Sequence, residues 1–522
     1  MRWRTIPQLI AEAAERGGEA TFLYYRRRRI SFRALHLRSS AVANALLELG
    51  LRRGDKLGLL LPNCPEFLYA WFGASKAGIV CVPINIQLKS HEAAELLRHC
   101  RARALVVSQG MASYADLLRE ACPQLEHIIW ANASGAPGPS LEELMKSQEP
   151  LPPPVAVTPE DDACIIYTSG TTGRPKGVVL AHRTYTLTGE AFPYWLGLTK
   201  QDRLYTCLPL YHINAQAYTI MGGLALGASV VLSERFSASR FWQELAEYGA
   251  TQFNFIGAML LILAKRPPSE AERAHNVRLA YGVPCLPEQQ RQELERRFNL
   301  RIVFGYGLTE STFGFIEPLE GPRRPMSVGL PRQHPLQSFN EAKIVDEQGR
   351  ELPPGSVGEI VFRNPAIMKG YYGEPELTKE ALKDGWLHTG DLGYRDEEGF
   401  FYFVDRKKDI IRRRGENISS QEVEVVLASH PKVRECAVIP VPSELSDEEV
   451  KAYVVPMPGV ELDARELFEW CSRRMASFKV PRFIELREAL PKTPTGRVAK
   501  YLLRQEREPK GPCFDREQLA QR

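Results

Sequence analysis

The sequence predicts an α/β protein with a large N-terminal domain of parallel αβα layers, a small β subdomain and a small α+β C-terminal domain. Three observations lead to this prediction. The chain has 522 residues, more than one hydrophobic core usually serves. Short apolar strands alternate with helices up to about residue 400. A separate pattern of helices and strands then begins, long enough to fold by itself.

Helix and strand signals alternate along the N-terminal domain. Residues 32–50 have helical spacing and end on a glycine, 56–62 form an apolar strand, and 65–78 form a further helix. The strands continue as "IVCVPIN", "ALVVS", "HIIWA", "ACIIYTS", "RLYTCLP", "SVVLSE" and "QFNFIG". Strands that alternate with helices favour a largely parallel sheet covered on both faces.

The later part of the chain breaks this rhythm. Residues 321–336 are rich in proline, and the strand-like pieces "EAKIVDEQG" and "GEIVFRNP" follow with turn residues between them. They predict a small β-rich subdomain. Residues 403–417 are highly charged and are the expected joint. We therefore expect an N-terminal domain over residues 1–404 and a C-terminal domain over residues 405–522.

Charge argues against nucleic acid as a partner. The formal net charge is +4, which is small for this length, whereas a nucleic-acid binder needs a strongly basic face. Arg26 to Arg29 form a dense basic run between two apolar stretches. We interpret this run as the tip of a hairpin with solvated arginines.

The cysteine pattern and the apolar segments indicate the expected cellular location of the protein. The ten cysteines form no CxxC pair and no His/Cys cluster, so neither a disulfide framework nor a zinc site is expected. Residues 1–19 lack the apolar centre of a signal peptide and read as an amphipathic helix. The apolar run at 220–232 is shorter than the roughly 20 residues of a membrane span. We expect a cytoplasmic protein without a transmembrane segment.

Residues 165–179, "IIYTSGTTGRPKGVV", carry a strong functional signal. The common nucleotide loop reads GxxxxGK[ST], but here no lysine follows Gly173 and no hydroxyl follows Lys176. A plain turn would explain the glycines and the proline, but not four hydroxyls beside a lysine. We interpret the segment as a polyphosphate loop, in which backbone N–H groups and hydroxyls donate to phosphate oxygens and Lys176 neutralises charge.

This loop resembles the nucleotide-binding signature of the adenylate-forming superfamily, which includes acyl-CoA synthetases, luciferases and peptide-synthetase adenylation domains. Further signatures stand in the family's order over nearly the whole chain: "KAGIVCVPIN", "YGLTES" (306–311), "GWLHTGDLG" (385–393), "DRKKDIIRRRGENISSQEVE" (405–424) and "PKTPTGRVAKYLLR" (491–504). Within the superfamily the chain is most similar to carnitine/crotonobetaine-CoA and fatty-acid-CoA ligases, through "PLYHINAQAYT", "SERFSASRFW" and "RGENISSQEVE".

The resemblance implies an ATP-dependent acyl-CoA ligase that acts in two steps. A carboxylate attacks the α-phosphorus of ATP and expels pyrophosphate, and the thiol of coenzyme A then attacks the acyl-adenylate. ATP, Mg²⁺ and coenzyme A are the implied cofactors, and the implied partners are small molecules; a homodimer is compatible with the sequence. The resemblance also implies a mobile C-terminal domain that rotates between the steps about a hinge at Asp405.

The resemblance gives roles to residues that would contact the nucleotide. Tyr306 would stack on adenine, Gly307 is a further implied cofactor-binding residue, and Gly282 and Val283 stand in the place of the adenine-binding turn. Thr309 would donate to the α-phosphate. The β- and γ-phosphates would be held by Thr168, Ser169, Gly170, Thr171, Thr172, Gly173 and Lys176.

Magnesium and ribose would be bound by further polar residues. Glu310 and Thr171 are the implied magnesium ligands, since this cation prefers oxygen. The alternative for Glu310 is a carboxylate at a helix start. Asp391 would accept from the ribose hydroxyls, and Arg406 would donate to the same sugar. The alternative for Arg406 is a surface ion pair.

The remaining assigned residues concern the acid and coenzyme A. Gly415, Glu416 and Asn417 would line the path of pantetheine. His212 would line the acyl pocket, and the alternative is a buried histidine with one satisfied nitrogen. A general base is not expected there, because the attacking carboxylate is already ionised.

The closing motif departs from the family's pattern. The family usually has a lysine that bridges the substrate carboxylate and the α-phosphate, and this chain has Arg497 there. Arginine keeps the charge but is planar and bulkier. Three outcomes are open: Arg497 acts as the bridge, Lys500 or less readily Lys492 takes its place, or adenylation is slow.

Other functions and the identity of the acid stay open at this level. An adenylating enzyme with a different acyl acceptor and a non-catalytic nucleotide-binding protein are the alternatives. A quaternary ammonium acid of the carnitine type would require aromatic rings around its cation; fatty, aryl and bile-type acids are also open. The aromatic candidates, which are equally expected in a plain core, are Trp195, Phe253, Phe255, Phe313 and Phe315.

Overall fold

The structure is a computed structural model of the chain. It describes residues 3–131, 138–168, 175–256, 259–283, 285–406, 409–413, 416–442, 448–475, 477, 479–492, 497–506 and 509–516. Five residues of the predicted phosphate loop, Ser169, Gly170, Thr171, Thr172 and Gly173, lie outside these ranges, as does Gly415.

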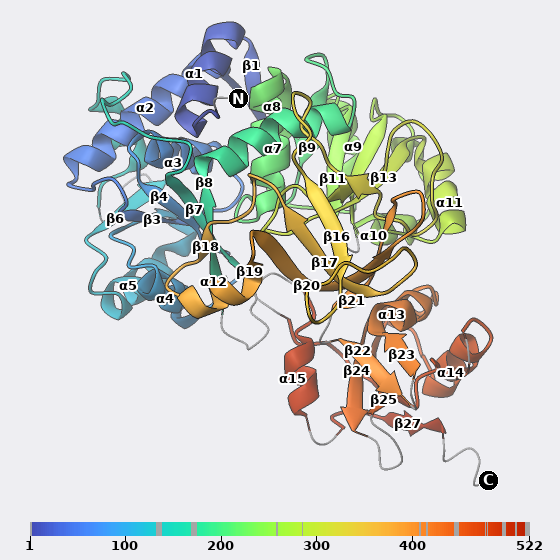
Figure 1. Cartoon of the computed structure of the whole chain (residues 1–522). Helices are drawn as coiled ribbons and strands as arrows, with labels where there is room; N and C mark the ends of the chain where they lie inside the picture. The colour runs from blue at the N-terminus through green and yellow to red at the C-terminus, as the bar shows by residue number, and fades with distance from the viewer. Residues whose placement is uncertain are drawn as a thin grey trace. The chain divides into compact units, whose positions relative to one another are not determined.

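The chain folds into two compact units. The first unit comprises Met1–Thr168, Pro175–Ala342 and Phe362–His388. The second includes Lys343–Val361 and Thr389–Arg522. The helices and strands of both units are labelled in Figure 1.

The first unit contains a nine-stranded sheet in the order β15-β14-β13-β12-β11-β9-β10-β1-β2. Its six central strands run parallel, whereas β2, β14 and β15 are antiparallel to their neighbours. The bounds are β1 Thr21–Tyr25, β2 Arg28–Ser31, β9 Arg203–Thr206, β10 Ser229–Leu232, β11 Gln252–Ile256, β12 Leu279–Val283, β13 Arg301–Tyr306, β14 Phe315–Ile316 and β15 Leu330–Pro331.

A second, seven-stranded sheet of this unit has the order β18-β8-β7-β4-β3-β5-β6. Strands β7, β4, β3, β5 and β6 are parallel, and β8 and β18 add antiparallel neighbours at one edge. The bounds are β3 Lys56–Leu60, β4 Val80–Pro83, β5 Ala104–Ser108, β6 His127–Ala131, β7 Asp162–Thr168, β8 Lys176–Ala181 and β18 Gly370–Tyr371. The predicted parallel β-structure is confirmed, but it forms two sheets.

Helices cover these sheets, as predicted from the alternating pattern. All twelve residues of α3 are buried, since this helix packs against α2 and the sheet and is apolar on nearly every side. Figure 1 shows α3 and the pair α4 and α5 on opposite sides of the seven-stranded sheet. The helices of the first unit are α1 Ile6–Gly17, α2 Phe32–Glu48, α3 Pro65–Lys76, α4 Ser90–His99, α5 Ala112–Ala121, α6 Leu141–Lys146, α7 His182–Trp195, α8 Met221–Leu226, α9 Phe241–Glu247, α10 Met259–Ala264, α11 Glu288–Phe298 and α12 Pro375–Ala381.

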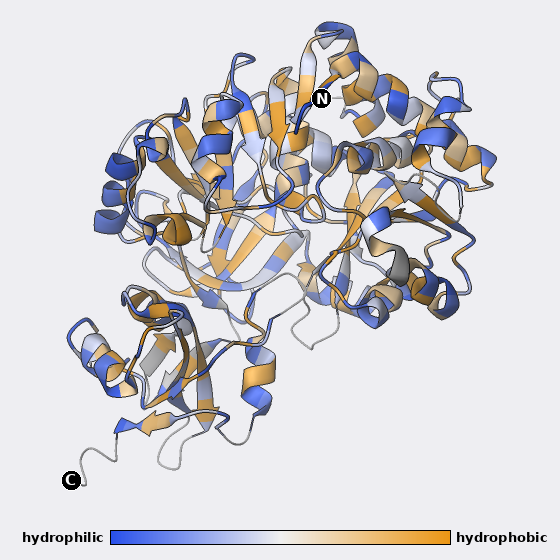
Figure 2. Cartoon of the chain, turned by 180° about the vertical axis from the view of Figure 1, so that it is seen from behind, coloured by the Kyte–Doolittle hydropathy of each residue, from blue (hydrophilic) through white to orange (hydrophobic). Residues whose placement is uncertain are grey.

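Hydrophobic residues concentrate between helices and strands. One buried cluster joins residues of β3 to β6 with the inner faces of α4 and α5, including Leu97, Val107 and Leu118. Figure 2 shows the strands mostly in orange, while the surface loops and the outer faces of the helices are mostly blue. Burial of these apolar side chains is the main term that holds the layers together.

The predicted β subdomain follows the proline-rich stretch. Strands β16 (Glu341–Val345), β17 (Gly358–Arg363), β20 (Trp386–Arg395) and β19 (Leu382–Lys383) form a sheet in that order, and β21 (Phe401–Arg406) also pairs with β20. The two predicted strand pieces "EAKIVDEQG" and "GEIVFRNP" therefore correspond to β16 and β17.

The C-terminal part of the second unit has its own core. A four-stranded sheet has the order β24-β25-β26-β27 and packs against helices, with Ile411, Val438 and Leu467 in the core. A hairpin of β22 and β23 precedes it. The bounds are β22 Ile410–Arg413, β23 Glu416–Ser419, α13 Ser420–Ala428, β24 Val433–Pro442, β25 Glu448–Pro456, α14 Ala464–Ser472, β26 Phe483–Leu486, α15 Lys500–Gln505 and β27 Cys513–Asp515.

The hairpin predicted around the basic run is confirmed. The basic run 26–29 forms the tip and second strand of the β1–β2 hairpin with exposed side chains. All ten cysteines are free thiols, and no group of three metal-ligating side chains occurs in the described ranges. Within the same residues no helix is long and apolar enough to span a bilayer.

Candidate active site

The predicted phosphate loop connects two paired strands of the first unit. Thr168 is the last residue of β7, and Lys176 is the first residue of β8. The two face each other as partners in the antiparallel ladder. The ladder of β7 and β8 therefore places Thr168 and Lys176 side by side, one at each end of the predicted loop segment.

The segment "YGLTES" leaves the end of β13 in the same unit. Tyr306 is the last residue of that strand, and its ring packs on Phe362 and Phe315 with centroid distances of 6.1 and 5.6 Å. Thr309 and Glu310 are half-buried, and Gly307 is exposed. Ligands commonly bind at the carboxyl ends of parallel strands, where this segment lies.

Tyr371 joins the hairpin to the "YGLTES" segment. Its hydroxyl donates to Glu310 Oε1 over 3.0 Å, and its ring centroid lies 5.0 Å from Lys176 Nζ. The backbone supports this arrangement: Met368 N–H donates to the Glu310 carbonyl, and Tyr371 pairs with Val178 of β8. Lys176, Tyr371 and Glu310 therefore form one cluster. No motif indicated Tyr371, because the pairing of β18 with β8 depends on residues far apart in sequence.

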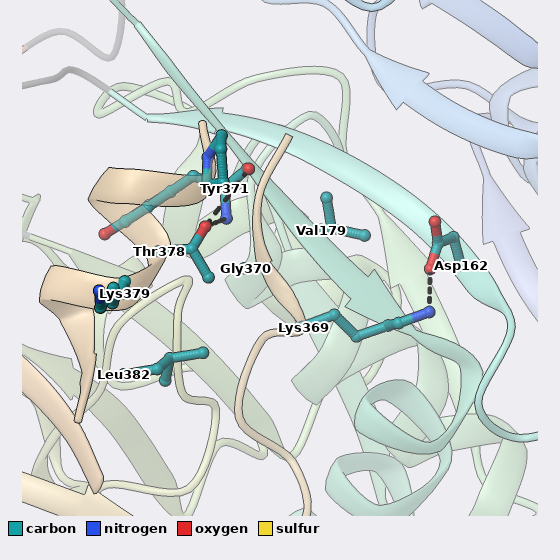
Figure 3. Close-up of a pocket in the computed structure, with 9 residues that line it drawn as sticks. Asp162, Val179, Lys369, Gly370, Tyr371, Thr378, Lys379 and Leu382 are labelled. Atoms are coloured by element: carbon teal, nitrogen blue, oxygen red, sulfur yellow. Dashed lines mark hydrogen bonds and ion pairs between the residues drawn. The ribbon is translucent and has the colours of Figure 1, made fainter. Parts of the chain in front are cut away.

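A cavity of about 400 Å³ is lined by residues of β18 and α12, together with Asp162, Val179, Lys369 and Leu382. Lys369 donates to Asp162 at 2.5 Å, and the Tyr371 backbone N–H donates to the Thr378 hydroxyl (Figure 3). The cavity shares Tyr371 with the cluster, but neither Lys176 nor Glu310 lines it. We therefore place the candidate site at the cluster.

The end of β12 provides Gly282 and Val283. A side chain on Gly282 would meet the Phe255 carbonyl at 2.1 Å, since β11 and β12 pair tightly there. This close approach explains the glycine.

His212 follows β9 in the same unit. It is half-buried, and its ring contacts the Tyr211 ring edge-on at a centroid distance of 4.7 Å.

The five aromatic side chains considered for an acid pocket are all buried. Trp195 is 6% exposed, and the others are at most 1% exposed: Phe253, Phe255, Phe313 and Phe315. Trp195 donates its indole N–H to the Gln333 carbonyl, and its ring lies against Arg332. These residues belong to the core rather than to an open cage.

In the second unit the two candidate ribose residues are neighbours. Asp391 of β20 pairs with Arg406 of β21 in the ladder, and Asp391 is 2% exposed. The preceding Gly390 has a φ of 70°, a left-handed conformation that favours glycine. Its N–H donates to Glu359, and Thr389 donates to the Ile360 carbonyl. The "HTGD" turn is therefore held in a defined shape.

The predicted hinge residue Asp405 is anchored within the second unit. It is 4% exposed, and its Oδ2 accepts from the backbone N–H groups of Ser420 and Gln421 at 2.6 and 3.3 Å. A carboxylate at the start of a helix satisfies unpaired N–H groups and favours the helix dipole. Asp405 thus binds the first turn of α13.

Three basic residues were considered for the bridging role in the second unit. Lys500 pairs with Glu424 at 2.8 Å and donates to Ser420. Burial opposes its charge, but the carboxylates of Glu424 and Asp409 outweigh burial and raise the pKa of Lys500. Lys492 pairs with Glu435. Arg497 is exposed.

Glu416 and Asn417 lie on β23, opposite Arg413 and Arg412 of β22. Gly415 lies outside the described residues. The backbone thus places this candidate pantetheine segment on one strand of a hairpin.

Comparison with known proteins decides the family. A model described as "AMP-binding enzyme" matches residues 10–372, and one described as "AMP-binding enzyme C-terminal domain" matches residues 422–497. The chain belongs to the AMP-binding enzyme family. The suspected superfamily is thereby confirmed.

Relatives in this family narrow the activity. A crotonobetaine/carnitine–CoA ligase of Salmonella arizonae is 38% identical, with 91% of this chain and 93% of the relative covered. The corresponding ligase of Citrobacter koseri is also 38% identical, over 96% of this chain and 99% of the relative.

Solved structures agree with these relatives. The anthranilate CoA ligase AuaEII, in complex with anthranoyl-AMP, matches with a TM-score of 0.89 at 28% identity, over 97% of both chains. ATP-bound MatB from Rhodopseudomonas palustris matches with a TM-score of 0.85 at 26% identity, over 96% of this chain and 99% of that one. The chain is thus an AMP-forming acyl-CoA ligase that uses ATP and coenzyme A, with the Mg²⁺ that is usual for this family.

Proposed function

We propose that this ligase activates its carboxylic acid at the cluster of Lys176, Tyr371 and Glu310. The observation that carries this proposal is the contact of Tyr371 with both other side chains, one from each signature segment. A cation and a carboxylate held together beside the predicted phosphate loop suit the binding of magnesium and phosphates.

The first reaction step is a displacement at phosphorus. A carboxylate oxygen of the acid bonds to the α-phosphorus, the bond from that phosphorus to the bridging oxygen breaks, and pyrophosphate leaves with the electron pair. Lys176 and the hairpin would neutralise the departing phosphates, and Thr309 would donate to the α-phosphate. Catalysis here rests on positioning and charge neutralisation.

Glu310 fits a magnesium ligand. Mg²⁺ is commonly held by one or two carboxylates together with substrate phosphates and water. The described residues offer no three-carboxylate cage, and Glu310 is a half-buried carboxylate that accepts a hydrogen bond from the Tyr371 hydroxyl. The ion would supply charge for the β- and γ-phosphates when bound.

In the second step the sulfur of coenzyme A attacks the acyl carbon and AMP leaves with the electron pair of the mixed anhydride. Asp391 and Arg406 would hold the ribose, and the segment of Gly415, Glu416 and Asn417 would guide pantetheine. We include in the proposal a C-terminal domain over residues 405–522 that rotates at Asp405 between the steps. The anchoring of Asp405 to α13 supports it as a fixed end of that joint.

Arg497 would bridge the acid and the α-phosphate during adenylation. Its position in the closing motif supports this role, and its side chain is exposed. The bridge needs only charge and reach, which arginine has.

The acid is either carnitine-like or fatty. The 38% identity to crotonobetaine/carnitine–CoA ligases supports the first class, and the sequence resemblance to fatty-acid-CoA ligases supports the second. We also propose that the protein is located in the cytoplasm.

The test is pyrophosphate release from ATP and Mg²⁺ with a panel of acids, with and without coenzyme A. The panel contains carnitine, crotonobetaine, fatty acids of several lengths and aryl acids. We expect release that depends on an acid, and a thioester when coenzyme A is added. ATP binding without release for any acid would overturn the proposal, and release without a thioester would indicate another acyl acceptor.

A further inference from the structure

Arg332 is a fully buried arginine next to the candidate site of the first unit. It follows β15 and is 1% exposed. Its Nη1 donates to the Tyr218 hydroxyl and to the Thr312 carbonyl at 2.8 and 3.0 Å, and its Nη2 donates to the Tyr281 hydroxyl. Every one of these partners is neutral.

The charge of Arg332 is not neutralised within the part of the chain that the structure describes. No carboxylate there forms an ion pair with Arg332, and its Nε has no hydrogen-bond partner there. Arg291, the other large buried arginine of this unit, differs: Glu317 pairs with it through two bonds of 2.6 and 2.7 Å. An arginine remains protonated when buried, so Arg332 is an uncompensated cation.

Three aromatic rings surround the guanidinium. Its carbon lies 4.9 Å from the Trp195 ring centroid, 5.3 Å from that of Tyr218 and 5.4 Å from that of Tyr281. Cation–π attraction of this kind is also what would recognise a quaternary ammonium group. Here the protein's own cation fills the aromatic cage.

The cage lies against the backbone at the end of β13 and the start of the "YGLTES" segment. A side-chain carbon on Gly305 would lie 2.6 Å from Arg332 Nη2, and one on Gly307 would lie 3.3 Å from Nη1. Tyr218 belongs to the π-helix Asn214–Ile220, which begins two residues after His212. Arg332 therefore connects the segment that carries Thr309 with the segment that carries His212.

We propose that Arg332 is a specificity-determining residue that disfavours acids with a cationic tail and favours acids whose tail carries no positive charge. This inference rests on the proposed function and adds that the tail of the acid lies between these two segments. In a water-poor site a second cation near an unpaired guanidinium is repelled strongly, because the effective dielectric constant is low. Between the two acid classes left open above, the inference favours the uncharged one.

A matched pair of acids tests the proposal on the unaltered enzyme. γ-Butyrobetaine and 5,5-dimethylhexanoate have nearly the same shape and differ by the charge of the terminal group. We expect kcat/KM to be at least tenfold higher for 5,5-dimethylhexanoate. Equal or better use of γ-butyrobetaine would overturn the proposal, whatever the variants do.

Substitutions at Arg332 and Tyr218 test whether the charge of Arg332 determines the preference between the two acids. R332M removes the charge and keeps a similar volume, and we expect it to reduce the kcat/KM ratio of the two acids at least fivefold. R332K keeps the charge and should retain the ratio. Y218F, which removes one hydrogen-bond partner but leaves the guanidinium, should also retain it. A ratio that is unchanged in R332M, with folding verified by thermal melting, would contradict the proposal.

The experiment distinguishes failure of the Arg332 proposal from failure of the proposed ligase function. No turnover of any acid would refute the proposed function itself. Turnover of both acids without discrimination by charge would leave the ligase function intact and refute only the role of Arg332. If R332M does not fold, the ratio for the unaltered enzyme and for R332K decides.

Discussion

At the residue scale, a small number of side chains give the candidate site its character. Tyr371 is the clearest of these, because its hydroxyl meets a carboxylate and its ring faces a lysine. A hydrogen bond to a charged group contributes about 1.5–3 kcal/mol. The orientation of Glu310 should therefore depend on the Tyr371 hydroxyl.

We predict that Y371F lowers the rate of acid-dependent pyrophosphate release about tenfold and raises the Mg²⁺ concentration needed for half-maximal rate. The ring that faces Lys176 is retained, whereas the hydroxyl contact with Glu310 is lost. Y372F is the matched control, since the Tyr372 ring contacts His99 instead. Equal effects of the two variants would contradict the assigned role.

The closing motif gives a second prediction at this scale. R497A should lower acid-dependent pyrophosphate release at least tenfold without changing the melting temperature, since Arg497 is exposed. K500A should lower the melting temperature, because it leaves the mostly buried Glu424 without its cation. If both variants release pyrophosphate at the original rate, the bridging hypothesis is wrong.

At the element scale, pairing between strands determines where functional segments meet. The hairpin of β7 and β8 brings Thr168 and Lys176 together, and β18 adds Tyr371 to the same edge. The ladder of β20 and β21 likewise aligns Asp391 with Arg406. These neighbours follow from strand register, which depends on long-range pairing.

The tight pairing of β11 and β12 leads to a prediction about Gly282. G282A would place a carbon 2.1 Å from the Phe255 carbonyl, so the strands must separate. We expect a loss of about 2–3 kcal/mol in the free energy of unfolding, measured by denaturant titration. G110A is the control, because nothing lies within 4 Å of the added carbon there. If G282A and G110A both changed the free energy of unfolding only slightly, β12 would accommodate the added carbon, and the prediction would be wrong.

At the scale of the whole molecule, buried titratable groups determine how stability depends on pH. His182 at the start of α7 is 1% exposed and accepts a hydrogen bond from Ile6 N–H at 3.4 Å. Burial lowers the pKa of His182 from 6.5 to about 4. The unfolded chain therefore binds a proton at a higher pH than the folded chain does.

We predict that the stability contributed by neutral His182 is fully present above pH 6.5 and is lost as the pH falls from 6.5 to about 4. The shift corresponds to about 3 kcal/mol. Denaturant titrations between pH 7 and pH 4.5 should show a flatter dependence for H182N than for the unaltered protein. H91N, at an exposed position, should follow the unaltered protein. If the free energy of unfolding of H182N fell with pH as steeply as that of the unaltered protein, the prediction would be wrong.

The sequence by itself determined the α/β class, the parallel strands, the β1–β2 hairpin and the family, because each depends on local periodicity or on ordered motifs. The glycine loop and "YGLTES" could be recognised separately for the same reason. The contact of Tyr371 with both segments could not be predicted from the sequence. The same holds for the burial of the aromatic candidates. Only the tertiary structure showed that Trp195, Tyr218 and Tyr281 enclose Arg332, since these side chains come from segments far apart in the chain and meet through sheet order and packing.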